Sequence, residues 1–256
     1  MEYDLKSFDP SQYRCNFINA GDYEKLLNEL KAIDSLEVVL AGCETGVKLA
    51  DQLSEDLGLP SNGRLKTEAR RDKYAMAKAL TSAGLRSAKT YLVDSLAELE
   101  NALNELGLPV VVKPCASAGS DDVYICRTKD EVVDAFKRVH LKTNTLGLVN
   151  KGVLLQQLLL GRQYIVNSVS YAGKHFAVEI WEDNREDAGS AYIYNYERLL
   201  LSYGQLEKDL VEYTKAVLNA LGIRNGPCHV ELMVNEGIPT LIEVGARPAG
   251  GIERDH

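Results

Sequence analysis

The sequence predicts an α/β fold of the mixed, α+β kind, in which alternating strands and helices are followed by antiparallel hairpins. Three observations predict it. Apolar, β-branched runs alternate with helix-patterned segments over residues 36–157. Strand-like runs then flank glycine turns over residues 164–244. Finally, 256 residues with 45% hydrophobic content supply the core of one large or two small globular domains.

Residues 1–63 are expected to form part of an N-terminal α/β domain. Residues 22–33 place apolar side chains at helical spacing behind Asp22, which suits a helix N-cap. Residues 36–40 form a short β-branched run, and a tight loop leads from it into a second helical pattern over 47–57. This order of strand, loop and helix is typical of a nucleotide-fold-like α/β half.

The next part of the chain is predicted to alternate strands and helices in one compact lobe. A charged helix ends at Gly84, which suits a helix C-terminus, and later helices begin at the capping residues Ser95 and Thr128. The predicted elements are a helix over 67–83, a strand over 88–93, a helix over 95–106, strands over 109–113 and 122–126, a helix over 129–140 and a strand over 153–157.

The remainder is predicted to be antiparallel in character. A glycine turn at Ala172-Gly173 joins two β-rich runs into a hairpin, and Gly222 ends a long helix. A polar stretch over 182–190 is expected to be a surface loop. The predicted elements are strands over 164–171 and 174–181, a helix over 205–221, and strands over 228–234 and 239–244.

The charge balance argues against a nucleic-acid partner. The chain has 29 Lys and Arg against 37 Asp and Glu, a formal net charge of −8. Binding to a polyanion or an anionic membrane needs clustered basic residues that replace counterions. No nucleic-acid or membrane partner is therefore expected, although a local basic pocket is compatible with this composition.

The chain is predicted to be cytoplasmic. No apolar run approaches the roughly 18 residues that span a bilayer, and the first residues lack the pattern of a secretory signal. The five cysteines are odd in number and lack a Cys-x-x-Cys pair, so free thiols in a reducing compartment are expected. The four histidines include no spaced pair of the kind that binds zinc.

Two lysines form the first candidate site. Lys113 directly precedes the small-residue loop 114–120, and Lys73 lies upstream. Backbone N–H groups of such a loop can bind phosphate oxygens while the ammonium groups neutralise their charge. The pattern is not a Walker A motif, because no Gly-Lys-Ser/Thr is present. The alternative interpretation is a surface turn with two solvated lysines.

Two glutamates and an arginine form the second candidate site. Glu231 and Glu243 are embedded in apolar strands joined by a short turn, so they are expected to face each other across a hairpin. Facing carboxylates repel unless a cation lies between them, and Mg²⁺ prefers such oxygen ligands. Arg247, in the small-residue stretch 245–251, suits bidentate binding of a carboxylate or phosphate. The alternative is a pair of solvent-facing strand glutamates.

Taken in chain order, these features resemble the ATP-grasp superfamily over residues 62–251. The subgroup with the greatest similarity comprises carboxylate-amine ligases of the bacilysin-type L-amino acid ligase branch. The resemblance rests on Arg71-Asp72-Lys73, the run 108–114, Ser117-Ala118-Gly119-Ser120, Leu155-Gln156-Gln157 with Gly161-Arg162-Gln163, Glu231, and Glu243 with Arg247 four residues later. It implies two lobes that clasp ATP over 64–256, a lid lobe over about 88–155 and a metal-bearing lobe over about 156–256, preceded by part of a Rossmann-like α/β half.

The resemblance also implies a role for each matching residue. Lys73 and Lys113 would contact ATP phosphates, and Ser117, Ala118, Gly119 and Ser120 would form a lid over them. Gln156 would meet the adenine amino group, the backbone of Gln157 and Leu159 would contact the ring, and Gln163 would meet the ribose. Glu231 and Glu243 would hold Mg²⁺, with Mn²⁺ as the alternative metal, and Arg247 and Lys113 would be catalytic.

Three positions depart from the wider superfamily. Gln156 and Gln163 stand where glutamate is common, and an amide can still bond adenine or hydroxyl groups. Gly245 stands two residues after the second metal glutamate, where asparagine is often found. Glycine at this position is expected within the amino acid ligase branch.

The implied activity is an ATP- and Mg²⁺-dependent ligase that joins a carboxylate, expected to be an amino acid, to an amine through an acyl phosphate. Its partners would be the small-molecule carboxylate and amine, and a homodimer is left open. Family members usually begin with a complete α/β half and continue beyond the position of Arg247. A catalytically silent ATP-binding module that needs a missing segment or partner is therefore the alternative. A nicotinamide-binding fold is disfavoured, because 42–46 lacks Gly-x-Gly-x-x-Gly spacing.

Overall fold

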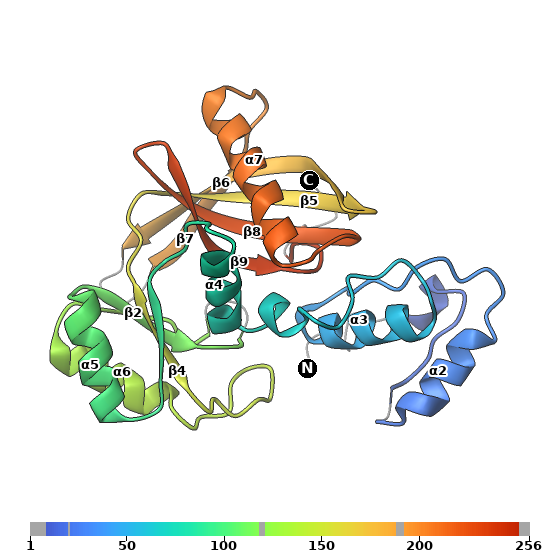
Figure 1. The fold of residues 1–256 in the computed structure, drawn as a ribbon, viewed down its shortest axis with the longest axis horizontal. Helices are drawn as coiled ribbons and strands as arrows, with labels where there is room; N and C mark the ends of the chain where they lie inside the picture. The colour runs from blue at the N-terminus through green and yellow to red at the C-terminus, as the bar shows by residue number, and fades with distance from the viewer. Residues whose placement is uncertain (1–8, 20, 118–120, 188–191, 251–256) are drawn as a thin grey trace.

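The computed structural model describes residues 9–19, 21–117, 121–187 and 192–250, and arranges them around two β-sheets (Figure 1). The four-stranded sheet has the order β1-β4-β2-β3, and the five-stranded sheet has the order β7-β6-β5-β8-β9. The strands are β1 Thr90–Val93, β2 Val110–Pro114, β3 Tyr124–Cys126, β4 Val153–Gln157, β5 Arg162–Tyr171, β6 Lys174–Asp187, β7 Tyr192–Leu199, β8 Gly226–Asn235 and β9 Ile238–Gly245. The helices are η1 Pro10–Gln12, α2 Tyr23–Lys31, η2 Glu44–Gly46, α3 Val47–Asp56, η3 Glu68–Arg70, α4 Lys73–Ser82, α5 Leu96–Leu106, α6 Lys129–Val139 and α7 Gln205–Ala220.

All three strand pairings of the four-stranded sheet are antiparallel, and β4 lies between β1 and β2. The helices α5 and α6 each follow one strand and bury leucine, valine and phenylalanine side chains against the sheet. Each helix begins at the N-cap predicted from the sequence. The Ser95 hydroxyl accepts from the Glu98 amide at the start of α5, and Thr128 and Glu131 form a capping box at the start of α6.

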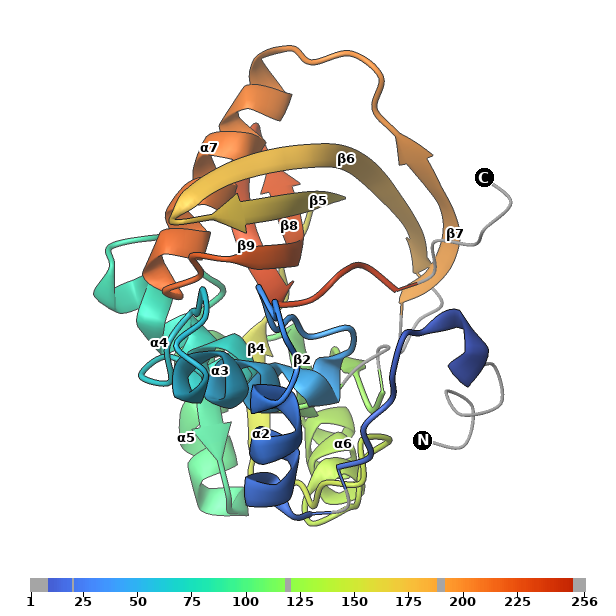
Figure 2. The same ribbon diagram turned by 90° about the vertical axis from the view of Figure 1, so that its right-hand side faces the viewer.

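The five-stranded sheet is built from hairpins with tight turns. Ala172 and Gly173 join β5 to β6 with φ angles of 50° and 82°, which explains the glycine at the second position. The helix α7 packs on one face of this sheet, together with α4, over a core that includes Leu210, Val217 and Val230 (Figure 2). Because strand residues alternate between faces, the charged residues between these apolar positions lie on the opposite face.

The predicted mixed α/β fold is confirmed, with differences near the N-terminus. The helices α2 and α3 pack against each other in a small apolar cluster of their own, to one side of the two sheets (Figure 1). The strand predicted over 36–40 is wrong: these residues form no strand, and Val38 and Leu40 are exposed. An isolated β-branched run needs a neighbouring strand edge, and the described residues provide none there.

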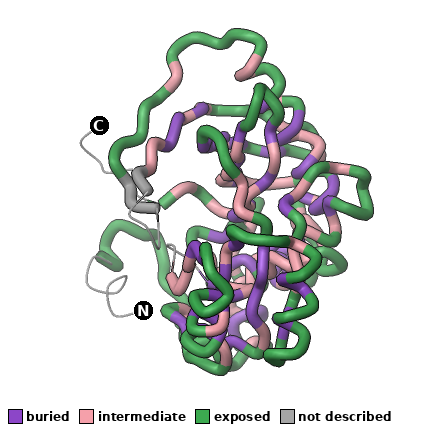
Figure 3. The backbone as a smooth tube through the Cα atoms, turned by 90° about the vertical axis from the view of Figure 1, so that its left-hand side faces the viewer, coloured by how far each residue is buried: buried purple, intermediate pink, exposed green. Residues whose placement is uncertain are grey.

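The prediction of a loop over 182–190 is also wrong for its first six residues, 182–187. Strand β6 continues to Asp187 and pairs with β7, a strand that the sequence did not suggest. The polar side chains are compatible with the strand because they have partners on neighbouring strands: Glu182 pairs with Arg162 and with Arg198. Residues 195–199 of β7 form an exposed edge, whereas buried positions concentrate in the interior of the two sheets (Figure 3).

The helix predicted over 67–83 is divided in two. A 3₁₀ turn, η3, ends at Arg70, and α4 begins at Lys73 behind its own N-cap, Asp72. Residues 71 and 72 therefore lie between two helices. This break places Lys73 in the first turn of α4, next to the end of β2.

Candidate active site

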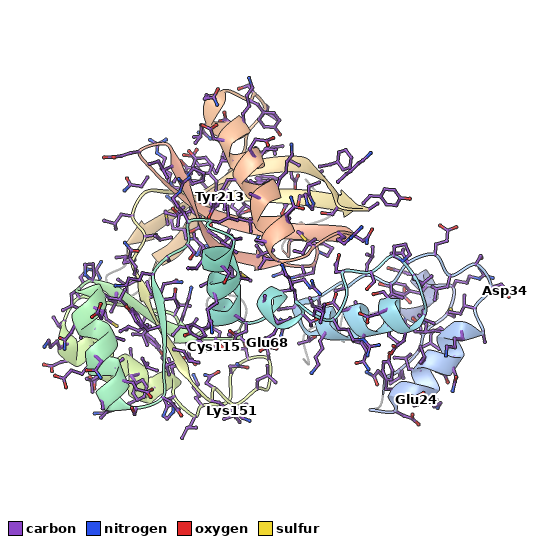
Figure 4. The ribbon with its side chains drawn as sticks, viewed as in Figure 1. Glu24, Asp34, Glu68, Cys115, Lys151 and Tyr213 are labelled. Carbon is purple, nitrogen blue, oxygen red and sulfur yellow. The ribbon has the colours of Figure 1, made fainter. Side chains whose placement is uncertain are left out.

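Lys73 connects three elements at the beginning of α4. Its backbone amide donates to the carbonyl oxygen of Cys115 at 2.9 Å. Cys115 directly follows β2 and is labelled close to the lower end of α4 in Figure 4. Its ammonium group lies 3.0 Å from the Glu243 carboxylate and donates to the carbonyl oxygen of Ser117 at 3.1 Å. Lys73 therefore joins α4, the loop after β2 and the strand β9.

Lys113 lies near Lys73 on β2, and its side chain is buried. Burial and the positive charge of Lys73 lower the pKa of Lys113 to about 8. Burial also acts against the charged form of Lys73, but the Glu243 carboxylate outweighs it and raises the pKa of Lys73. The two ammonium groups thus lie in one charged cluster, in which Lys113 loses its proton first as the pH rises.

Glu231 and Glu243 are directly opposite each other in the β8–β9 register, as the sequence predicts. A bulge follows Glu231 in this pairing. Burial raises the pKa of Glu243, but Lys73 and Lys113 outweigh burial and hold that pKa below its ordinary value. Glu243 is therefore ionised in the folded protein. We refer to Lys73, Lys113, Glu231 and Glu243 as the lysine–glutamate cluster.

Three further side chains surround Glu231. Gln163 donates to one carboxylate oxygen at 3.0 Å, and Arg185 lies 3.8 Å from the same oxygen. The His229 ring nitrogen Nε2 lies 3.3 Å from the other oxygen, and its Nδ1 lies 3.0 Å from the Asn167 side-chain oxygen. Glu231 is consequently held in orientation from both sides.

Arg247 lies beyond β9 and contacts the N-terminal part of the chain. Its Nε donates to Glu44 at 3.2 Å, and Arg71 pairs with the other oxygen of the same carboxylate. One guanidinium NH₂ group of Arg247 also donates to the carbonyl oxygen of Pro248 at 2.7 Å. Glu44 therefore links two arginines next to the lysine–glutamate cluster.

The segment between β4 and β5 contains the residues expected at adenine. Gln156 is buried, and its amide donates to Thr90 on the neighbouring strand at 2.9 Å. The backbone amide of Gln157 donates to the carbonyl oxygen of Lys89 at 2.9 Å. Leu159 lies in the connection between the two sheets. The roles of these residues toward adenine stay predictions.

A pocket of about 310 Å³ lies beside this connection. Its lining includes Leu159, Gln163, Asp183, Arg185 and Met233. The lining is mostly polar, with the apolar side chains of Leu159 and Met233 at one part of it and five charged residues: Arg162, Glu182, Asp183, Arg185 and Arg198. We call it the β5–β6 pocket. The expected contact of Gln163 with ribose stays a prediction, and in this structure the Gln163 amide binds Glu231.

The expected lid is described only at its first residue. The hydroxyl of Ser117 donates to Asp121 at 2.8 Å, and Ser117 is largely buried. Ala118, Gly119 and Ser120 lie outside the described residues. The lid assignment therefore stays a prediction.

The site predicted from the sequence did not include Glu44, Asp183, Arg185 or His229. The sequence does indicate His229, because it stands two residues before Glu231 in the same strand. Both side chains therefore lie on the same face of the sheet. No local pattern indicated the contact of Glu44 with Arg247, because the two residues are 203 positions apart.

The described residues lack two features, a membrane-spanning helix and a preformed metal-ligand group. No helix among them is both long enough and apolar enough to cross a bilayer. In the same residues, no group of three or more His, Cys, Asp and Glu side chains is placed to hold a metal ion. A cation at Glu231 and Glu243 would thus need ligands from a bound molecule or water.

Comparison with known proteins identifies the family. A family model described as an ATP-grasp domain matches residues 106–255, more than half of the chain. The chain belongs to the ATP-grasp family.

Curated relatives define the similarity further. Dapdiamide A synthase of Enterobacter agglomerans is 34% identical over 93% of this chain and 56% of its own length. Alanine–anticapsin ligase of Bacillus subtilis (strain 168) is 26% identical over 77% of this chain and 45% of its own length. The expected resemblance to the amino acid ligase branch is confirmed. The chain spans about half the length of these curated relatives.

Solved structures confirm the fold. The L-amino acid ligase from Bacillus licheniformis superposes with a TM-score of 0.73 at 23% identity, over 90% of this chain and 54% of that one. The D-alanine–D-alanine ligase from Bacillus anthracis superposes with a TM-score of 0.70 at 21% identity, over 96% of this chain and 80% of that one.

Proposed function

We propose that the chain binds ATP and belongs to a ligase that joins a carboxylate, that of an amino acid, to an amine. The convergence of the lysine–glutamate cluster from α4, β2, β8 and β9 carries this proposal. Two ammonium groups and two facing carboxylates suit a nucleotide triphosphate that is bound with a divalent cation. Membership of the ATP-grasp family and the ligase names of the curated relatives support it.

Glu231 and Glu243 fit a divalent cation. They are hard oxygen donors in opposite register, and the part of the chain that the structure describes adds no third metal ligand. This donor set suits Mg²⁺, or Mn²⁺, which takes further ligands from water and phosphate oxygens. When bound, the ion would supply positive charge next to the phosphate groups. Gln163 and His229 would keep the Glu231 carboxylate in orientation.

The nucleotide would lie along the face of the five-stranded sheet opposite to α7. Lys73 and Lys113 would bind its phosphates, with Ser117, Ala118, Gly119 and Ser120 covering them. The base would lie at Gln156, Gln157 and Leu159, and the ribose would lie at Gln163 in the β5–β6 pocket. The lining of this pocket by Leu159 and Met233 supports this orientation, because apolar side chains suit the faces of a base.

The proposed reaction has two steps. A carboxylate oxygen attacks the γ-phosphorus of ATP, and the bond between this phosphorus and the β,γ-bridging oxygen breaks. The products of this step are an acyl phosphate and ADP. The amine nitrogen then attacks the acyl carbon, phosphate leaves, and an amide forms with loss of a proton. Lys73, Lys113 and Arg247 would stabilise the negative charge that develops in both steps. Exclusion of water by the loop after β2 would protect the acyl phosphate from hydrolysis.

Product formation tests the proposal. The protein is incubated with Mg-ATP and a panel of amino acids, and ADP is measured by a coupled assay while amides are measured by mass spectrometry. We expect ADP and an amide for at least one pair, and loss of both in Glu243→Gln. The matched control is Glu236→Gln, which removes an exposed carboxylate from the turn of the same hairpin and should leave turnover unchanged.

The alternative of a silent ATP-binding module has a distinct outcome in the same experiment. It predicts that ATP raises the melting temperature while neither ADP nor amide forms with any amino acid pair. Absence of both ATP binding and turnover would contradict the proposed function entirely.

A further inference from the structure

Asp183 is a buried carboxylate whose binding capacity is only partly used. It lies on β6 and is 3% exposed. Its Oδ2 accepts from the Arg185 Nε at 2.8 Å. Its Oδ1 is buried and has no hydrogen-bond partner among the described residues. An unpaired buried acceptor destabilises a protein unless a ligand or water supplies the missing donor.

The position of Asp183 on the sheet relates it to the proposed nucleotide site. Gln163 on β5 is the direct cross-strand partner of Asp183 on one side and of Met233 on the other. All three line the β5–β6 pocket. Met233 is two residues from Glu231, which is about 7 Å along the strand. Asp183 thus lies two strands away from Glu231, the carboxylate that would stand next to the phosphates, and two residues further along the strand direction.

A sugar suits the position of Asp183 on the sheet. The phosphates of the proposed nucleotide lie at the lysine–glutamate cluster, and the base lies at the connection that contains Leu159. The group between them is the ribose, which presents two adjacent hydroxyl donors. The Gln163 amide already donates to Glu231. The acceptor that is buried, charged and unpartnered at this point is therefore Asp183 Oδ1.

We propose that Asp183 binds the ribose hydroxyls of ATP through its Oδ1. This inference rests on the proposed function, because it requires the nucleotide to lie along this face. Burial removes the donors that water would supply to Asp183, and this raises its pKa although the charge of Arg185 acts in the opposite direction. Neutral hydroxyl donors satisfy it without a further cation, and Arg185 already provides the counter-charge.

Binding of ATP, 2′-deoxy-ATP and 3′-deoxy-ATP by calorimetry tests this role. In the wild type we expect at least one deoxy form to bind about tenfold more weakly, the effect of one hydrogen bond to a charged acceptor. In Asp183→Asn, the Arg185 Nε is a donor, so the amide oxygen must face it and the NH₂ group faces the pocket. This variant should bind ATP about tenfold more weakly and should no longer distinguish the deoxy forms.

The matched control is Glu197→Gln. Glu197 is the cross-strand partner of Asp183 on β7, so the substitution makes the same charge change one strand away on an exposed residue. It should retain the wild-type preference for ATP. Thermal unfolding of each variant establishes that it is folded before titration.

The outcomes separate this inference from the proposed function. If the wild type binds ATP and both deoxy forms with the same affinity, the proposed role of Asp183 is wrong while the ATP site stands. This comparison needs no variant. The role is also wrong if Asp183→Asn discriminates as the wild type does. If the wild type does not bind ATP, both proposals fail.

Discussion

Two ion clusters that include residues close together in the sequence, Arg70 and Lys73, differ in how completely their hydrogen bonds are satisfied. In the first, the fully buried Arg70 binds Asp51 through Nε and one NH₂ group at 3.1 and 2.9 Å. Its guanidinium also donates to carbonyl oxygens of Gly63, Leu221 and neighbouring residues. Arg70 therefore ties α3 and the segment before α4 to the end of α7.

The lysine–glutamate cluster begins only three residues further along the chain, at Lys73. The Lys73 ammonium group has fewer hydrogen-bond partners than the Arg70 guanidinium group. The ammonium and carboxylate groups of the cluster come from four elements, and the pKa of Lys113 is lowered to about 8 by burial and by Lys73. Glu243 and Lys73 also remain partly accessible. We infer that the Arg70 cluster stabilises the fold, whereas the lysine–glutamate cluster is available to a charged ligand.

Removing Arg70 should have the largest effect on stability. Arg70→Met leaves Asp51 buried without its partner, so we expect the free energy of unfolding to fall by about 3–5 kcal/mol. Urea denaturation measures this. The control is Arg64→Met, which removes a half-exposed arginine from its ion pairs with Glu55 and Asp56 and should cost much less. Equal losses in the two variants would contradict the structural role of Arg70.

Removing Lys73 should instead affect ligand binding. Lys73→Met deletes one charge-assisted contact to phosphate, so the affinity for ATP should fall about ten- to a hundredfold. Its effect on the free energy of unfolding should be smaller than that of Arg70→Met, because Lys113 remains next to Glu243. Calorimetry and urea denaturation check the two effects. Lys78→Met, an exposed lysine on the same helix, is the control and should change neither.

The lowered pKa of Lys113 should make ATP binding depend on pH. Lys113 loses its proton as the pH rises through about 8, so the affinity for ATP should fall over that interval. Lys113→Arg stays charged and should remove this dependence if it folds. The stability effect has the opposite sign. Between the folded pKa and the ordinary value of 10.5, the unfolded chain binds more protons, so this group makes the free energy of unfolding rise with pH.

A solvent-exposed pair on α7 should show the smallest effect. Lys215 and Glu212 lie 2.7 Å apart at the i, i+3 spacing, and both side chains are exposed. Lys215→Ala should change the free energy of unfolding by no more than about 0.5 kcal/mol. A loss as large as that of Arg70→Met would show that burial does not explain the difference between the clusters.

Local pattern was sufficient to predict most of the secondary structure. Capping residues and apolar spacing determined where α5, α6 and α7 lie, and the glycine turns determined the two hairpins. The same reasoning placed Glu231 opposite Glu243, because a short turn fixes the register of its strands. It failed for 36–40 and for β7, where a neighbouring strand rather than the local sequence decides whether a strand forms.

Contacts between distant segments could not be predicted from the residues alone. The ion pair of Lys73 with Glu243 and the contact of Arg247 with Glu44 depend on how the two sheets and the N-terminal helices meet. The charged residues of β6 were interpreted as a loop because polar runs are usually solvated. Their partners on neighbouring strands, such as Arg198 for Glu182, become visible only in three dimensions.

The central claim is that the lysine–glutamate cluster binds ATP together with a divalent cation. Calorimetric titration of ATP with and without Mg²⁺, into the wild type and into the double variant Glu231→Gln, Glu243→Gln, tests it most directly. We expect Mg²⁺ to tighten ATP binding in the wild type and to have no such effect in the double variant. An equal effect of Mg²⁺ on both proteins, or no ATP binding by the wild type, would contradict it.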